Sequence, residues 1–355
     1  MDFFNSRIHT WYSFYKRDLP WRNSSNPYFV WLSEIILQQT RVDQGLAYYL
    51  RFTEEFPTIN DLADASEDQI LKLWQGLGYY SRARNLHFTA KVIQNNYNST
   101  FPSDYNSIKS LKGIGDYTAA AISSICFGLE YPAVDGNIYR VLSRYFGIHE
   151  PIDTNSGKKV FQKLATELIT GTDPGMHNQA LMEFGALQCT PKNPDCQQCP
   201  LIEGCFAYSH QEVSNLPIKQ NRTTQRNRYF NYLVFGYHNY TWLRKRINND
   251  IWKGLFEFPL IETIEKTTVE MILAHEKLLE LTNHCNATIT NISGWKIHIL
   301  SHQRIHYRFI RIWLPEEIQM RHNFIKVIKQ DIFNFAVPKL LETYMDEYFR
   351  NDSFI

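Results

Sequence analysis

The sequence CTPKNPDCQQCPLIEGC, residues 189–205, holds four of the six cysteines of this 355-residue chain. The spacing is C-x6-C-x2-C-x5-C, at Cys189, Cys196, Cys199 and Cys205. Thiolates gathered on one short loop are typical metal ligands. A zinc site with four cysteines usually joins two C-x2-C pairs across a spacer, whereas this loop has one such pair with an outer cysteine on each side. The spacing therefore favours a [4Fe–4S] cluster over a single zinc ion.

Zinc and a pair of disulfides stay open as alternatives for these cysteines. Disulfides are the less favoured, because the N-terminal stretch MDFFNSRIHTWYSFYKRDLPW has neither the apolar core nor the cleavage site of a secretory signal. The lack of a targeting segment also predicts a cytoplasmic protein, bacterial by default. The order of preference is cluster, then zinc, then disulfides.

The composition describes a folded chain with no membrane segment. Hydrophobic residues make up 44% and aromatic residues 15%. No stretch approaches the roughly 18 uninterrupted apolar residues of a membrane span. The net charge of +1 means that a nucleic-acid partner would be bound through local basic patches and backbone amides. The length predicts about two domains.

The apolar pattern changes character along the chain. Residues 1–208 are predicted to be helical, because segments such as Trp31–Tyr49, Glu67–Trp74 and Val160–Leu168 carry apolar residues three and four positions apart. Residues 209–228 are polar and indicate a linker.

The remaining residues, 229–355, predict an α+β domain. The stretch Tyr229–Tyr237 is rich in aromatic and β-branched residues, and residues 305–309 alternate between apolar and polar. Val269–Leu281 has a helical pattern. The chain is therefore predicted to have an all-α domain followed by an α+β domain.

Residues 111–118, LKGIGDYT, predict a tight glycine turn that opens a helix. Gly113 and Gly115 can adopt positive φ and let a DNA backbone phosphate approach closely. The free N–H groups at the start of the helix would then bind that phosphate. Asp135 lies twenty residues beyond Gly115, just before a glycine, where an aspartate commonly shapes a turn or caps a helix.

The glycine hairpin, the later aspartate and the cysteine loop together resemble the iron–sulfur branch of the helix-hairpin-helix DNA glycosylase superfamily. Over about residues 10–208, three blocks look like adenine DNA glycosylases of the MutY type: PWR at 20–22, WLSEIILQQT at 31–40 and GLGYYSRARNL at 76–86. Such enzymes remove adenine mispaired with 8-oxoguanine. The resemblance implies a [4Fe–4S] cluster and a monomer that binds double-stranded DNA containing adenine opposite 8-oxoguanine or guanine.

Glu34 is the candidate acid. It lies among apolar residues of a predicted helix, where burial would raise its pKa so that it holds a proton near neutrality. The ordinary alternative is an exposed glutamate beside Arg41 or Gln38. Adenine leaves only after a ring nitrogen is protonated, and its departure leaves positive charge on the sugar, so the reaction needs one acid and one carboxylate. The resemblance assigns these roles to Glu34 and Asp135.

Tyr117 distinguishes two branches of the superfamily. In relatives of the endonuclease III type, a lysine at this place forms a Schiff base with the sugar and cuts the strand, which requires an amine. Tyr117 has none, so the resemblance implies a monofunctional glycosylase in which Tyr117 and Asn137 support the two carboxyl groups. Lys112 lies on the other side of the glycine turn. The alternatives are an endonuclease III-type glycosylase/lyase and a non-catalytic DNA-binding protein held by zinc.

The target base must leave the helical stack before it can react. The resemblance assigns four residues to wedging the duplex beside 8-oxoguanine: Gln39, Thr40, Leu77 and Tyr79. It assigns Arg22 and Glu183 to the adenine pocket. The ordinary alternative is that Leu77 is a core residue and that Tyr79 and Arg22 are surface residues.

The C-terminal domain resembles the MutT-like (Nudix) domain of these enzymes, most clearly in residues 251–259, IWKGLFEFP. Residues 260–281 lack the R-E-x-x-E-E pattern of the hydrolases, so the domain is predicted to recognise and not to hydrolyse. The family's Phe-Ser-His loop for 8-oxoguanine corresponds to Leu300-Ser301-His302 here. Ser301 and His302 keep their hydrogen-bonding groups, but the aromatic residue is lost. The alternative is a Ser-His pair that faces solvent at a strand end.

Overall fold

The computed structural model describes residues 2–221, 224–282, 285–320 and 323–350. Its packing divides the chain into two units. The helical unit comprises Met1–Asp64 and Asn85–Asn221, and the C-terminal unit comprises Ala65–Arg84 and Arg222–Ile355. The segment Ala65–Arg84 therefore packs with the C-terminal unit although it lies early in the sequence. The predicted division into 1–208, 209–228 and 229–355 stays a prediction.

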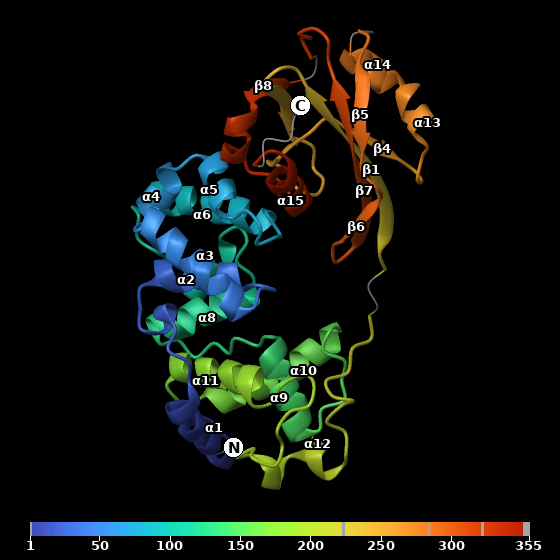
Figure 1. Cartoon of the computed structure of the whole chain (residues 1–355). Coiled ribbons are helices and arrows are strands. Elements are labelled where there is room, and N and C mark those ends of the chain that lie inside the picture. The colour runs from blue at the N-terminus through green and yellow to red at the C-terminus, as the bar shows by residue number, and fades with distance from the viewer. Residues whose placement is uncertain (1, 222–223, 283–284, 321–322, 351–355) are drawn as a thin grey trace. The chain divides into compact units, whose positions relative to one another are not determined.

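The helical unit is built from short helices that follow one another closely along the chain (Figure 1). Its helices are α1 (Asp2–Tyr15), α2 (Pro27–Leu37), α3 (Val42–Glu55), α4 (Ile59–Asp64), most of α6 (Ser81–Asn96), α7 (Tyr105–Ser110), α8 (Asp116–Phe127), α9 (Gly136–Phe146), α10 (Asn155–Ile169), α11 (Pro174–Leu187) and α12 (Phe206–Ser209). Two short 3-10 helices, Pro20–Arg22 and Ile202–Gly204, complete it.

The helix ends follow local sequence signals. Asp104, Asp135, Thr154 and Asp173 each accept a backbone N–H at the start of a helix, which satisfies donors that the helix itself leaves unpaired. The predicted helical segment Trp31–Tyr49 is two helices, because the backbone turns between Gln38 and Arg41. Gln39 there has a φ of 57°, which an α-helix cannot accommodate.

A core of aliphatic and aromatic side chains joins four of these helices. Phe4 and Ile8 of α1 pack in it with Leu142 of α9, Phe161 of α10 and Phe184 of α11. The N-terminal helix is thereby fixed against helices more than 100 positions later in the sequence. This core positions α9 and α11, which both carry candidate site residues.

The glycine hairpin joins α7 to α8, as predicted. Gly113 has a φ of 86°, and a Cβ there would lie 2.8 Å from the Cβ of Asn85. Gly115 is the N-cap of α8 and has a φ of −95°, so the expectation of positive φ holds for Gly113 alone. A Cβ at Gly115 would meet nothing within 4 Å, which leaves the start of α8 open to a ligand.

The C-terminal unit contains two β-sheets and helices at several edges (Figure 1). The larger sheet has the order β4-β1-β7-β5, with β6 also paired to β7, and the smaller has the order β3-β2-β8. The β1–β7 pair is parallel, and the other strand pairs are antiparallel. The strands are β1 (Arg226–Gly236), β2 (Tyr240–Lys245), β3 (Phe256–Glu257), β4 (Leu260–Thr263), β5 (Thr288–Ile292), β6 (Lys296–Ile299), β7 (Gln303–Trp313) and β8 (Phe324–Ile328).

Helices cover both faces of the larger sheet. Ile310 of β7 packs in a core with Leu278 and Leu281 of α14 (Glu276–Thr282). Its neighbour Phe309 stacks on Tyr344 of α15 (Lys339–Tyr348), with ring centroids 3.8 Å apart. Adjacent residues of a strand point to opposite faces, so the burial of both Phe309 and Ile310 shows that β7 is covered on both sides here, whereas the alternation over residues 305–309 indicates only one buried face.

The predicted helix Val269–Leu281 is broken in two. The first piece, α13, is Val269–Leu273, and α14 begins at Glu276. The side chain of His275 accepts a hydrogen bond from the N–H of Lys277 at 3.2 Å. This side chain caps α14 and competes with the continuation of α13.

The C-terminal unit also includes α5 (Glu67–Leu73) and the first turn of α6.

Part of the predicted linker 209–228 is fastened to the helical unit. Leu216 is buried, and the N–H of Ile152 donates to the carbonyl of Ile218 at 3.0 Å. The carboxylate of Asp153 accepts the N–H groups of the two residues that end the unit, at 3.0 and 2.8 Å. Within the described ranges, no helix has the length and apolar character needed to traverse a lipid bilayer.

Candidate active site and cysteine loop

A cavity of about 180 Å³ in the helical unit brings together most of the candidate residues of that unit. Side chains from α2, α8, α9 and α11 line it. The predicted site residues in its wall are Arg22, Glu34, Thr40, Tyr117, Asp135, Asn137 and Glu183. These residues span more than 160 positions of sequence, so the cavity is a product of the tertiary fold.

Glu34 lies on α2 and is mostly withdrawn from solvent. Burial raises the pKa of its carboxyl group to about 7, a hydrogen bond from Tyr117 opposes the rise, and the charge of Asp135 adds to it. A carboxyl group with such a pKa is protonated in a large fraction of molecules near neutral pH. Glu34 is therefore suited to donate a proton.

Asp135 is held differently. It caps α9, and its Oδ1 accepts the N–H groups of Asn137 at 2.9 Å and Ile138 at 2.8 Å, while its Oδ2 accepts the side-chain amide of Asn137 at 2.7 Å. Burial raises the pKa of Asp135, but these three donors stabilise its ionised form. Among the described residues, the hydrogen bond that lowers the pKa of Glu34 comes from the Tyr117 hydroxyl, so Asp135 has more donors to stabilise its ionised form than Glu34 has.

The cavity wall contains no lysine among the described residues. The hydroxyl of Tyr117 lies 3.1 Å from the sulfur of Met182, and both the burial of the ring and the nearby carboxyl groups hold its pKa well above the usual range. The amine of Lys112 lies over the ring of Phe88, 4.6 Å from its centroid. An amine nucleophile is therefore missing from the described wall of this site.

Glu183 is another carboxylate in this cavity, and both of its oxygens accept several hydrogen bonds. Its oxygens accept hydrogen bonds from the guanidinium of Arg22 at 2.8 and 2.6 Å, from the guanidinium of Arg17 at 2.9 and 2.6 Å, and from the N–H of Arg17 at 2.9 Å. Burial opposes ionisation, but these bonds lower the pKa of Glu183 to about 2. Sequence reasoning missed Arg17; its only signal was a second arginine five positions before Arg22.

The predicted wedge residues fall in both units. Thr40 lines the active-site cavity, and Gln39 is exposed on the turn after α2. Leu77 and Tyr79 belong to the C-terminal unit and line a separate cavity of about 410 Å³. Leu77 is buried there, whereas Tyr79 is 45% exposed and has a φ of 48°.

Ser301 and His302 line the same cavity as Leu77 and Tyr79. The hydroxyl groups of Tyr79 and Ser301 are hydrogen-bonded to each other across 222 positions of sequence. Trp252 and Leu300 also line this cavity. Sequence reasoning did not single out Trp252.

The four cysteines of the loop meet around one small cavity. All four are free thiols, so the disulfide alternative is wrong. Burial and the charges of its three neighbours raise the pKa of Cys199 to about 12. Four thiolates can coexist here only with a compensating cation, which fits a metal centre.

Arg144 of α9 secures the loop. Its guanidinium donates to the carbonyl oxygens of Thr190 at 2.8 Å and Pro191 at 3.2 Å, and it lies 3.5 Å from the sulfur of Cys189. The loop is thus attached to the helix that begins at Asp135. When bound, an iron–sulfur cluster would be held by the four cysteines and would tie the ends of this loop together.

Three family models match the chain. Residues 32–168 match the helix-hairpin-helix (HhH-GPD) superfamily of base excision DNA repair proteins, residues 189–205 the iron–sulfur binding domain of endonuclease III, and residues 231–347 the NUDIX domain. The fold and site therefore define a base-excision DNA glycosylase with an iron–sulfur loop. The predicted [4Fe–4S] cofactor and both predicted fold classes are confirmed.

Individual relatives narrow the class. The adenine DNA glycosylase of Buchnera aphidicola subsp. Schizaphis graminum is 37% identical over 311 residues, which are 82% of this chain and 89% of that protein. The one of Buchnera aphidicola subsp. Acyrthosiphon pisum is 32% identical over 95% of this chain and 94% of that protein. The chain belongs to the adenine DNA glycosylase family. A solved thermostable thymine-DNA glycosylase is 32% identical with a TM-score of 0.54, covering 58% of this chain and 95% of that one.

Replacing Glu34 by glutamine should stabilise the fold at alkaline pH. The pKa of Glu34 is about 7 in the folded chain against an ordinary value of 4.5, so the cost of its buried charge appears above pH 4.5 and is complete above pH 7. Glu34→Gln should therefore exceed the wild type in free energy of unfolding by about 1–3 kcal/mol at pH 8, and by much less at pH 5. Urea unfolding at both pH values measures this.

The control for that experiment is Glu54→Gln, which removes an exposed carboxyl group from α3. It should change the free energy of unfolding equally at the two pH values. A Glu34→Gln protein that is no more stable than the wild type at pH 8 would show that Glu34 is not held in a water-poor site.

Replacing Cys199 by serine should reduce the iron and sulfide bound per chain, because it removes one of four thiolate ligands. The stability of the helical unit should fall with the cofactor, since metal binding and folding are coupled. Iron analysis, visible absorption and thermal unfolding measure these changes. Cys285→Ser, outside the loop, is the control and should retain full iron. Full iron in the Cys199→Ser protein would contradict the assigned ligand set.

Proposed function

We propose that this enzyme hydrolyses the N-glycosidic bond of adenine in duplex DNA when adenine lies opposite 8-oxoguanine, and more weakly when it lies opposite guanine. The observation that carries the proposal is the pair Glu34 and Asp135 in one cavity, of which the first has a pKa of about 7 and the second has three hydrogen-bond donors. Such a pair supplies one acid and one persistent carboxylate. Its location in an adenine glycosylase family supports adenine as the leaving base.

In the proposed mechanism, the protonated carboxyl group of Glu34 gives its proton to a ring nitrogen of the flipped adenine. The bond between C1′ and the base then breaks, and its electron pair leaves with adenine. The carboxylate of Asp135 stabilises the positive charge that remains on the sugar. The Glu34 carboxylate next accepts a proton from a water molecule whose oxygen bonds to C1′, which restores the acid.

Other residues hold these groups in place. Asn137 fixes Asp135 through two hydrogen bonds, and Tyr117 bonds to Glu34. Arg22 and Glu183 are proposed to line the pocket for the flipped base, with Arg17 keeping Glu183 ionised. The Glu183 carboxylate thus orients the guanidinium groups of both Arg17 and Arg22, which favours a rigid pocket.

DNA is proposed to bind through the glycine hairpin, where Gly113 and Gly115 leave the start of α8 accessible to a phosphate. Gln39, Thr40, Leu77 and Tyr79 are proposed to fill the space left by the flipped base. The exposure of Gln39 and Tyr79 supports this role for them. Leu77 is buried in the described structure, so its role would require it to become accessible when DNA binds.

The C-terminal unit is proposed to recognise 8-oxoguanine through Ser301 and His302. The shared cavity with Tyr79 and the hydrogen bond between Tyr79 and Ser301 support a joint site. Trp252 offers an aromatic surface that compensates for Leu300 at the place of the family's phenylalanine. In this proposal, residues 1–208 carry catalysis, 209–228 connect, and 229–355 recognise the lesion.

The enzyme is further proposed to act as a monofunctional monomer on chromosomal DNA in a bacterial cytoplasm. The tyrosine at position 117 and the lack of lysine in the described cavity wall favour a glycosylase without strand cleavage.

The central test uses purified protein and duplex oligonucleotides with adenine opposite each base and opposite 8-oxoguanine. Free adenine and alkali-sensitive sites should appear for 8-oxoguanine and, more slowly, for guanine. Glu34→Gln should lower the single-turnover rate by at least about 100-fold, because a general acid contributes roughly 100- to 10,000-fold. The rate of the wild type should fall as the pH rises above about 7, since Glu34 loses its proton there.

The same assay separates the alternatives. Glu54→Gln, the exposed control on α3, should keep the wild-type rate. Release of an oxidised pyrimidine together with strand cleavage before alkali treatment would support the endonuclease III-type lyase. DNA binding without any base release would support a non-catalytic protein.

Removing the hydrogen-bonding groups of the proposed lesion site should reduce the preference for 8-oxoguanine over guanine. The double variant Ser301→Ala, His302→Ala should lose roughly tenfold or more in the ratio of excision rates, because it abolishes hydrogen bonds to the lesion. His238→Ala changes an exposed histidine of the same unit outside that cavity and serves as control. An unchanged ratio in the double variant would contradict the role of this loop.

A further inference from the structure

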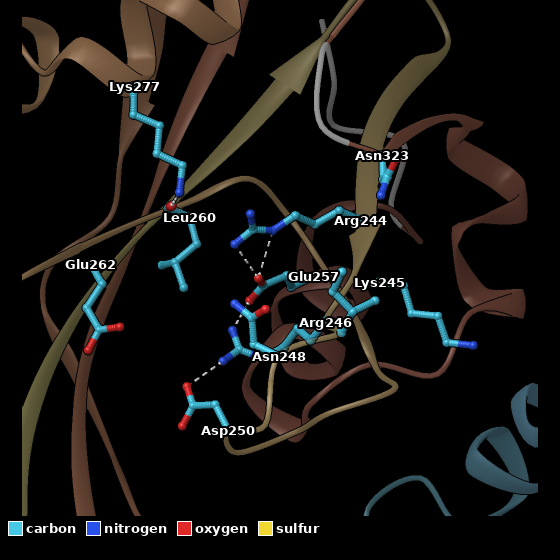
Figure 2. Close-up of a pocket in the computed structure, with 11 residues that line it drawn as sticks. Arg244, Lys245, Arg246, Asn248, Asp250, Glu257, Leu260, Glu262, Lys277 and Asn323 are labelled. Carbon is cyan, nitrogen blue, oxygen red and sulfur yellow. Dashed lines mark hydrogen bonds and ion pairs between the residues drawn. The ribbon is translucent and has the colours of Figure 1, made fainter.

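The C-terminal unit contains a second polar cavity, of about 400 Å³, that the glycosylase reaction does not use (Figure 2). It lies among β2, β3, β4 and α14. Its wall is rich in charged side chains, and basic residues enter it from β2 and from α14. The way these charges are paired decides what the cavity can bind.

The carboxylate at the centre of this cavity is fully committed. Glu257 is entirely buried, and its Oε1 accepts Nε and Nη2 of Arg244 at 3.0 and 2.9 Å. Its Oε2 accepts Nη1 of Arg246 at 2.5 Å. A buried carboxylate with two arginines has no capacity left for a metal ion or another cation. Glu257 therefore acts as an anchor that orients two guanidinium groups.

The other two carboxylates of the wall are also paired. Asp250 accepts two hydrogen bonds from Arg228, both at 2.8 Å, and one from Arg246 at 2.9 Å. Glu262 accepts two from Arg228, both at 2.7 Å. No unpaired carboxylate therefore remains in the described wall. Each of its carboxylates is paired with one or two of three arginines, Arg228, Arg244 and Arg246.

Lys277 and Arg244 are left with unused capacity. The amine of Lys277 donates to the carbonyl oxygen of Leu260 at 2.6 Å, a neutral partner. Arg244 uses Nε and Nη2 for Glu257, and its Nη1 has no hydrogen-bond acceptor in the parts of the chain that the structure describes. The ring of Phe324, 5.6 Å from the guanidinium carbon, braces Arg244 from one side.

These two cations point toward the same space. Figure 2 shows the Lys277 amine and the Arg244 guanidinium directed into the cavity, while Lys245 extends away from these two groups. Burial lowers the pKa of Lys277 and the like charge of Arg244 lowers it further, while the carboxylates of Glu257, Glu262 and Glu280 act in the opposite direction. An anion between them would relieve that repulsion.

The charge balance of the cluster also favours an anion as the ligand. Lys245 also borders the cavity but pairs with Asp68. The other four cationic side chains of the cluster share three carboxylates, so the cluster has one more positive than negative charge. The cations are Arg228, Arg244, Arg246 and Lys277, and the carboxylates are Asp250, Glu257 and Glu262.

We propose that this cavity binds a phosphate group, with Arg244 and Lys277 as its direct ligands. Glu257 occupies the Nε–Nη2 edge of the Arg244 guanidinium, so an anion in the cavity can reach Arg244 only through its remaining N–H groups, chiefly those of Nη1. These N–H groups and the ammonium group of Lys277 converge from different elements and suit the separated oxygens of a tetrahedral anion. Because residues 260–281 lack a glutamate-rich helix, the phosphate is bound and is not hydrolysed.

The phosphate group has two possible sources, a free phosphate or diphosphate and the backbone of DNA. The first experiment titrates the full-length wild-type protein with inorganic phosphate and with pyrophosphate, at constant ionic strength, by calorimetry and thermal unfolding. Lys277→Gln should weaken binding by roughly tenfold or more, because it removes a charge-assisted hydrogen bond. Arg244→Lys, which keeps the charge but changes the geometry, should also weaken it.

Lys245→Gln is the matched control. Lys245 is adjacent to Arg244 in sequence and borders the cavity, but its amine pairs with Asp68 at 2.5 Å and extends away from Lys277 and the Arg244 guanidinium. This variant should keep the affinity of the wild type within about twofold. Equal weakening by Lys245→Gln and Lys277→Gln would reveal a general charge effect and overturn the proposal.

The second experiment identifies the source. Duplex DNA binding is measured against salt concentration for the same variants. If the ligand is a backbone phosphate, Lys277→Gln should reduce the DNA affinity and lower the salt slope by about one, and Lys245→Gln should not. If the ligand is free phosphate, only the first titration should respond. A Lys277→Gln protein that matches the wild type in both experiments overturns the proposal, whatever the outcome of the adenine excision assay.

Discussion

The carboxyl groups of Glu34 and Asp135 occupy one water-poor cavity, where burial makes ionisation of either group costly and the charge of each opposes the charge of the other. Their hydrogen bonds divide the roles. Asp135 has three N–H donors because it caps α9, while Glu34 sits in the middle of α2 and depends on a single tyrosine hydroxyl. An asymmetric pair of this kind provides an acid and an anion at the same pH. The remainder of the helical unit can be understood as the support that brings α2, α8 and α9 to this place.

The fold indicates the type of reaction more firmly than it indicates which base the enzyme removes. The solved thymine-DNA glycosylase shares the fold of the helical unit, whereas the curated relatives that match most of this chain are adenine glycosylases. In the active-site cavity, Glu183 accepts five hydrogen bonds from Arg17 and Arg22, which fix both of its oxygens. A pocket that is rigid before the base arrives loses little entropy on binding.

Two parts of the molecule act at a distance from that chemistry. The cysteine loop is attached through Arg144 to α9, the helix that Asp135 caps, so loss of the cofactor would be felt first in the stability of the site. The carboxylates of the second polar cavity in the C-terminal unit are ion-paired, whereas a metal-dependent hydrolase needs free carboxylates. The unused hydrogen-bonding capacity of Arg244 and Lys277 is the basis of the proposed phosphate site.

Short-range patterns in the sequence were enough to predict the cysteine loop, the glycine hairpin and the strand β7, because each depends on neighbours within a few positions. The sequence also indicated Glu34 and Asp135, through their place in family blocks. Local backbone detail was less predictable. One expected helix is broken at His275, where a side chain caps a new helix, and Gly115 does not need the positive φ that Gly113 has.

Only the tertiary structure decided which distant groups share an environment. The pairing of Arg17 with Glu183, the contact of Tyr79 with Ser301 and the convergence of Arg244 with Lys277 join residues that are 166, 222 and 33 positions apart. A pKa depends on burial and on charges that surround a group in space, and one-dimensional spacing does not encode these distances. The sequence by itself therefore determined which reactive groups this protein has and which local elements carry them. The packing of those elements decided how deeply each carboxyl group is buried, how many donors it has, and which cations keep unused hydrogen-bonding capacity.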